Sequence, residues 1–117
     1  MSLKGDMMVF DSGSVWKALA DPTRRQILER LAEGPETTGG IVAEFSPRLV
    51  RTAVMKHLGI LEGAGLIRVE RLGRTRWNHI ERKPLVTVSS WLDRRMGQHR
   101  SQLKSLKALA EETASSA

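Results

Sequence analysis

The sequence has no cysteine among its 117 residues. This absence excludes disulfide bonds, thiolate metal ligands, cysteine nucleophiles and switches based on thiol oxidation. Long apolar runs are also missing, and none approaches the roughly 20 residues that a membrane-spanning helix needs. The N-terminus lacks the basic, apolar and small-residue order of a secretory signal peptide. We therefore expect a cytoplasmic protein with no membrane partner.

The residue patterns of common enzyme and metal sites are absent as well. The sequence contains no glycine-rich phosphate loop, no nucleophile elbow and no evident acid–base pair. The histidines, His57, His79 and His99, never stand three or four residues from one another or from a carboxylate, the spacing that puts two ligands on one helix face. We expect no enzyme activity, no metal site and no cofactor.

Positive charge is what the sequence has in excess, with a formal net charge of +6 and a pI of about 10.5. Residues 48–83 carry nine lysines and arginines against three acidic residues, whereas the rest of the chain carries ten of each sign. The whole excess therefore lies in one segment, which is typical of a surface that binds a polyanion. A basic excess that only aids solubility would not need this clustering.

The length suits one compact domain. We place it at residues 11–112, after a flexible N-terminus of residues 1–10. No repeat or low-complexity tract interrupts it. The elements expected within it are four helices, a hairpin and a long last helix.

Three of these helices belong to the first half of the chain. The first ends near Ala20, and Asp21-Pro22 then caps and begins the second. The second helix places Ile27, Leu28 and Leu31 on its buried face and Arg24, Arg25 and Arg30 in solvent. Thr37 or Thr38 caps a short third helix.

A fourth helix is expected at about residues 48–63. Its apolar residues recur at spacings of three and four, which indicates one buried face. These residues are Val50, Val54, Leu58 and Leu61. Two runs of bulky and β-branched residues follow at 66–71 and 74–80, and the Leu72-Gly73 pair between them predicts a β-hairpin.

This order of elements predicts a mainly α fold with a small β-hairpin, arranged as a winged helix-turn-helix. The helix at about 48–63 would lie in the DNA major groove, and the hairpin at about 66–80 would be the wing. The helix residues that point away from the buried face, together with Arg51 at the edge, are candidates for contacting base edges: Arg48, Arg51, Thr52, Met55 and Lys56. We expect His57, at the flank of the buried face, to pack or to bond to the backbone instead.

The hairpin carries three arginines near its turn, Arg71, Arg74 and Arg76. Like charges at one tip repel each other, so a polyanionic partner explains why they are there. We expect them to contact phosphates or the minor groove. The alternative is that they keep exposed strand edges from pairing with other chains.

A dimer is expected because two helices carry more apolar surface than one small core can bury. The last helix, at about 84–112, keeps apolar residues at threes and fours almost to its end, and the N-terminal helix has no evident local partner. The expected contact residues are Val15, Trp16, Leu19, Leu92, Met96, His99, Leu103 and Leu106. Such a dimer would present two recognition helices to a palindromic site. The alternative is a last helix that folds back on its own core.

Several segments are similar to a known family. Residues 18–28, ALADPTRRQIL, resemble the opening signature of the ArsR-type winged-helix repressors. Residues 53–62, AVMKHLGILE, with 64–67, AGLI, resemble their recognition helix and its exit, and the hairpin at 71–76, RLGRTR, resembles their wing. The resemblance covers residues 15–80. It implies a homodimeric transcriptional regulator, usually a repressor that leaves its operator when a metal or another signal binds.

The metal-sensing members of that family carry cysteines in the third helix, or paired histidine and acidic ligands in the last helix. Residues 37–45 and 84–112 supply neither set. The chain is more similar to the members without metal-site ligands, whose inducer is often unidentified.

These features favour sequence-specific binding of double-stranded DNA for transcriptional control. The alternative function is a winged-helix module whose basic face docks an acidic protein. A third hypothesis, compatible with the first, is a pocket for an unidentified small-molecule inducer between the dimer helices, around Trp16 and Trp91.

Overall fold

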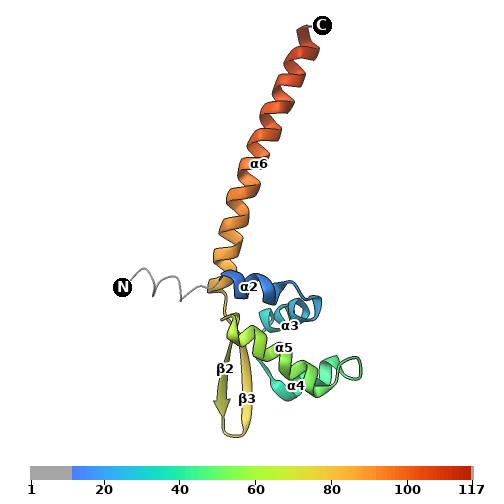
Figure 1. Ribbon diagram of the computed structural model, residues 1–117, viewed down its shortest axis with the longest axis vertical. Coiled ribbons are helices and arrows are strands. Elements are labelled where there is room, and N and C mark those ends of the chain that lie inside the picture. Colours follow the sequence, from blue (N-terminus) through green and yellow to red (C-terminus); the bar gives the residue numbers. More distant parts are fainter. Residues whose placement is uncertain (1–11, 117) are drawn as a thin grey trace, which may run out of the picture. The chain divides into compact units, whose positions relative to one another are not determined.

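The computed structural model describes residues 12–116, with the side chains of residues 13–97 and 104–112. The chain divides into two units, Met1–Pro84 and Leu85–Ala117, each of which is described by itself (Figure 1). The expected flexible N-terminus, residues 1–10, lies outside the described residues.

Helices α2 (Ser12–Leu19) and α3 (Pro22–Ala32) are the first two elements of the described residues. Asp21 caps α3 as predicted, because its Oδ1 accepts hydrogen bonds from the backbone amides of Thr23 at 2.8 Å and Arg24 at 3.1 Å. The predicted buried face of α3 is also confirmed, with Ile27, Leu28 and Leu31 in the core.

Two arginines of α3 hold the end of α2. Arg25 stays exposed, as we expected, whereas Arg24, also expected in solvent, is half-buried. Arg24 donates from Nε to the carbonyl of Ala18 at 2.8 Å and from Nη2 to that of Lys17 at 3.0 Å. Arg25 donates to the carbonyl of Leu19 at 2.8 Å. The last carbonyls of a helix have no partner within it, so cationic donors there satisfy them and complement the helix dipole.

Helix α4 (Thr38–Phe45) is capped by Thr37, one of the two predicted caps, whose hydroxyl accepts from the Gly40 amide at 3.0 Å.

Helix α5 (Arg51–Gly63) follows, three residues later than the predicted start. Val50 is its N-cap, in extended backbone conformation and 67% exposed, so its assignment to the buried face was wrong. The buried face of α5 consists of Val54, Leu58 and Leu61.

The end of α5 leads directly into the sheet. The amide of Leu66 bonds to the carbonyl of Leu61 and the amide of Gly65 to that of Glu62, both at 2.9 Å. This closing pattern requires a residue with positive φ, and Gly65 supplies it with φ 74°. Leu66 is thereby buried at the entrance to the first strand of the wing.

The predicted hairpin is confirmed as strands β2 (Ile67–Leu72) and β3 (Thr75–Ile80), which pair antiparallel. Leu72 belongs to β2, so the turn is Gly73-Arg74 rather than Leu72-Gly73, and Gly73 has φ 64°. A third strand was not predicted: β1 (Glu36–Thr37) pairs with the outer side of β3, giving the order β1-β3-β2. Two residues are too few to show an alternating pattern.

Together these elements form a mainly helical winged helix-turn-helix fold with a three-stranded wing sheet, as the sequence predicts. Helix α5 packs against α2, α3 and α4, and α4 lies against β3 (Figure 1). The fold thus fixes both the exposed face of α5 and the base of the wing.

The last helix, α6 (Lys83–Ser116), begins one residue before the predicted Pro84 and continues beyond residue 112. Among its described side chains, the large exposed apolar ones are Val86, Trp91, Leu92, Met96, Leu106 and Leu109. The guanidinium of Arg95 lies 5.2 Å from the centre of the Trp91 ring. None of the helices in the described part of the chain is long and apolar enough to cross a membrane.

Candidate nucleic-acid interface

The outward face of α5 carries four of the five residues predicted to contact bases. Arg51, Thr52, Met55 and Lys56 are all exposed. The opposite face is held in the core by Val54, Leu58 and Leu61, so this helix cannot rotate without exposing its apolar side chains. Among the described residues, neither Arg51 nor Lys56 has a hydrogen-bond or ion-pair partner.

Arg48, the fifth predicted residue, is not part of this helix. It lies in the turn that follows α4, with its guanidinium 5.3 Å from the centre of the Phe45 ring. Its Nη2 donates to Oε1 of Gln26 at 3.2 Å. The assignment of Arg48 to the recognition helix is therefore corrected. Its side chain remains exposed, but the turn, and not the α5 helix, sets the direction in which it points.

The wing arginines differ from one another in their surroundings. Arg71 and Arg74 are exposed, whereas Arg76 is half-buried and its Nε is a buried donor with no hydrogen-bond partner among the described residues. Arg71 and Arg76 lie directly opposite each other in the β2–β3 register. Because facing like charges are unfavourable in a sheet, this pair costs stability in the absence of an anion.

A groove with a volume of about 440 Å³ brings the helix and the wing together. Arg51 and Met55 of α5 line one part of it. The turn and strand β3 contribute Arg74, Thr75 and Arg76, and the start of α4 contributes Thr37, Thr38 and Gly39. Three of the predicted DNA-contacting arginines, from positions far apart in the sequence, therefore share one concave surface.

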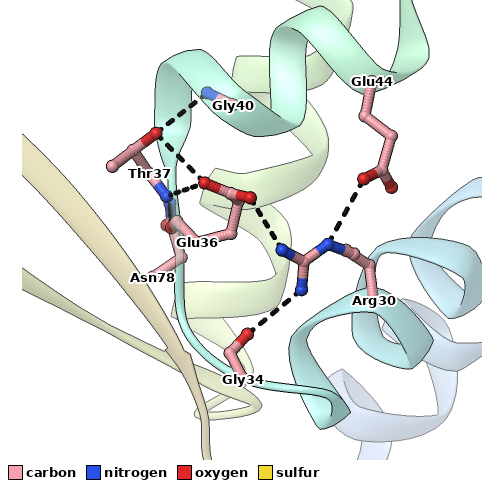
Figure 2. A network of polar contacts seen from close by, with 7 residues as sticks. All are labelled: Arg30, Gly34, Glu36, Thr37, Gly40, Glu44 and Asn78. Carbon is pink, nitrogen blue, oxygen red and sulfur yellow. Dashed lines mark hydrogen bonds and ion pairs between the residues drawn. The ribbon is translucent and has the colours of Figure 1, made fainter.

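A polar network fixes the start of α4 beside this groove (Figure 2). Glu36 accepts from Arg30 at 2.7 Å and from the Thr37 amide at 2.9 Å. Arg30 also pairs with Glu44 at 3.3 Å, and because its side chain is only 25% exposed, its predicted place in solvent was wrong. The Thr37 hydrogen bond, together with the charge of Arg30, holds the pKa of Glu36 below its ordinary value of 4.5. At Gly40 a Cβ atom would overlap the Glu36 carboxylate.

Asn78, which the sequence reasoning did not single out, joins the wing to this network. Its side chain is 1% exposed, and its Nδ2 donates to the Glu36 carbonyl at 3.2 Å and to the Thr38 hydroxyl at 3.1 Å. The only sequence signal for this role is that Asn78 is a polar residue at an inward-facing position of a strand. The hydrogen-bond partners of its side chain lie about 40 residues away in the sequence.

The histidines take structural places where the structure describes them. His57 is half-buried, as expected for a residue that packs at the flank of the buried face. Its Nδ1 lies 3.2 Å from Nη1 of Arg24, so its partner is a side chain and not the backbone. Nε2 of His79 lies 3.0 Å from Oε1 of Glu70 on the neighbouring strand. In the described part of the chain, no group of three histidine and acidic side chains could hold a metal ion.

The residues predicted for a dimer contact fall into three groups. Val15 is fully buried within its own unit, so it cannot contact a second chain, and its assignment is corrected. Trp16, Leu92, Met96 and Leu106 are exposed, and Leu19 is half-buried. The side chains of His99 and Leu103 lie outside the described residues.

Sequence comparison relates the chain to DNA-binding regulators. A family profile described as "Helix-turn-helix domain" matches residues 19–70. The HTH-type transcriptional regulator Rv2034 of Mycobacterium tuberculosis is 38% identical over 79 residues, which are 68% of this chain and 72% of the relative. The transcriptional repressor SdpR of Bacillus subtilis is 33% identical, with 68% of this chain and 86% of the relative covered.

Solved structures show the same similarity in three dimensions. The crystal structure of the ArsR family transcriptional regulator RHA00566 is 37% identical, with a TM-score of 0.68, and 76% of this chain and 90% of that chain are covered. A homodimeric winged helix-turn-helix domain, Mb0332 from Mycobacterium bovis, is 25% identical with a TM-score of 0.58, covering 74% of this chain and 79% of that domain.

Proposed function

Since the chain belongs to the ArsR family of winged helix-turn-helix transcriptional regulators, we propose that it represses transcription in the cytoplasm as a homodimer on a short palindromic DNA operator. The observation that carries this proposal is the groove in which Arg51 and Met55 of α5 face Arg74 and Arg76 of the wing. A single duplex placed along that groove can meet both sets of side chains.

The two sides of the groove would have different tasks. In the proposed complex, α5 enters the major groove with its N-terminal half toward the bases. Arg51, in the first turn, can pair with both acceptors of a guanine, and Thr52 and Lys56 can bond to neighbouring bases or phosphates. The wing arginines would bind phosphates or the adjacent minor groove, which sets register and affinity rather than sequence.

The dimer is proposed from exposed apolar residues on two helices. Trp16 on α2, and Leu92, Met96 and Leu106 on α6, are large apolar side chains in contact with solvent. The similar domain Mb0332 is homodimeric, and the similar protein SdpR is a repressor. A two-fold dimer would place two copies of α5 about one turn of DNA apart, roughly 34 Å, which requires a palindromic site. An inducer of unknown identity would act on this dimer.

The test is selection of bound duplexes from a random pool by the full-length protein. We expect one palindromic consensus, bound with an affinity that falls steeply as salt increases, because bound phosphates release counterions. Arg51→Ala should weaken binding to that duplex, whereas Lys107→Ala, the same charge change on an exposed position of α6, should not.

Two outcomes of this test would contradict different parts of the proposal. A folded protein that binds no duplex even at low salt would contradict the proposal and favour the acidic-protein partner. Binding that random duplex competes away completely would contradict sequence-specific control.

A further inference from the structure

We propose that Asn78 is a positioning residue for DNA binding: its buried amide fixes β3 to the start of α4, and so aims Arg74 and Arg76 into the groove that Arg51 lines. This inference rests on the proposed function. It adds a residue that does not face the groove but determines how many phosphates the wing can reach.

The attachment of the wing to α4 depends strongly on this one side chain. Strand β1 pairs with β3 over only two residues, Glu36 opposite Asn78 and Thr37 opposite Trp77. So short a ladder holds a projecting hairpin weakly. The Asn78 amide adds two hydrogen bonds, to the Glu36 carbonyl at 3.2 Å and to the Thr38 hydroxyl at 3.1 Å. Because the side chain is 1% exposed, losing these partners would leave a buried donor unsatisfied.

The acceptors of Asn78 are themselves held in place. Arg30 and the Thr37 amide bind the Glu36 side chain, and Thr37 caps α4 one residue before Thr38 (Figure 2). The amide therefore connects the wing to a rigid part of the helix-turn-helix motif and not to a loose loop.

The position of Asn78 on β3 connects this anchor to the arginines. Arg76 stands two residues before Asn78, so both side chains leave the strand on the same face. Arg76 then reaches the groove, where its Nε is a buried donor without a partner among the described residues. Arg74 lies further toward the hairpin tip, beyond this anchor. Since β3 and β2 are paired over six residues, a shift of β3 against α4 would move the hairpin tip and so change the positions of both guanidinium groups relative to Arg51.

The experiment measures duplex affinity across a series of salt concentrations, with the consensus duplex recovered by selection as the probe. For Asn78→Ala we expect affinity at low salt to fall about tenfold, and the slope of log affinity against log salt to become shallower by roughly 1 to 2, because wing phosphate contacts are lost. Thr38→Val, which removes one acceptor, should act in the same direction, and Thr38→Ser, which keeps the hydroxyl, should retain the wild-type slope.

Two controls separate positioning from loss of fold. Ile27→Val shortens a fully buried side chain of α3 and should lower the thermal midpoint without changing the salt slope. In an Arg74→Ala, Arg76→Ala background, Asn78→Ala should change affinity by less than about twofold, because the groups it positions are absent.

The inference is overturned if Asn78→Ala keeps the wild-type slope, or if its full effect persists in the background without wing arginines. Absence of duplex binding by the wild-type protein would instead overturn the proposed function, and this inference with it.

Discussion

The exposed face of α5 and the wing are both basic, but they are supported differently. The α5 cations stand on a helix whose opposite side is fully buried at Val54 and Leu61. The wing cations stand on a hairpin whose link to α4 is a two-residue ladder and the Asn78 amide. Apolar packing holds the helix. The base of the wing is also packed, with Ile67 buried, but directed hydrogen bonds join its strand β3 to α4. The difference suits a helix that must meet bases in one geometry and a wing that mainly binds phosphates.

The largest expected effect tests whether the buried face of α5 supports its exposed face. Leu61→Ala should destabilise the fold by about 2–5 kcal/mol, because it removes a fully buried side chain and leaves a cavity. Urea unfolding followed by circular dichroism checks this value. Met55→Ala, on the exposed face of the same helix, should change stability by less than about 0.5 kcal/mol. Equal effects would mean that the two faces are not distinct.

Specific binding should depend most on Arg51. Arg51→Ala should weaken binding to the selected duplex by about 10- to 100-fold and relax the preference at one base pair, because a bidentate contact to a base is lost. Affinities for the consensus and for its single-base variants measure both effects. Arg51→Lys keeps the charge but loses the forked geometry, so it should retain affinity better than base preference. A loss of affinity that is the same for every duplex would mean that Arg51 binds phosphates, as proposed for the wing arginines, and not bases.

A wing arginine should have a smaller and less selective effect. Arg74→Ala should lower affinity several-fold, by a similar factor for the consensus and for random duplex, and reduce the salt slope by about 1. Titrations of both duplexes at several salt concentrations measure it. A change confined to the consensus would show that the wing contributes to sequence preference.

The smallest effect concerns pH and the network at the base of the wing. The pKa of Glu36 lies below its ordinary value of 4.5, so the stability from its ionised form is present above that value and is lost as pH falls through the lower, folded-state pKa. Wild-type protein should therefore exceed Glu36→Gln in stability at pH 7, and the difference should shrink as pH falls below 4.5. Glu44→Gln, which removes a more exposed ion pair of the same arginine, is the control. A difference that is constant from pH 7 to pH 3 would contradict this role of Glu36.

Periodicity and caps predicted much of this ArsR-family protein correctly. The buried face of α3, the cap at Asp21, most of the buried face of α5 and the hairpin all follow from residues within one or two turns of each other. The start of α5 was predicted three residues too early, because Val50 fits the apolar spacing although its backbone is extended. Apolar spacing alone does not distinguish a helical residue from its cap.

The sequence by itself determined the basic segment at 48–83, the helix-turn-helix order and the type of residue on each helix face. Only the tertiary structure decided that Arg51, Arg74 and Arg76 share one groove. It also decided that Val15 is buried in the core of its own unit and that Asn78 joins β3 to α4. The physical reason is the range of the interactions. Helix faces and turns depend on neighbours a few residues away, whereas a buried amide that bonds across about 40 residues leaves no periodic trace in the chain.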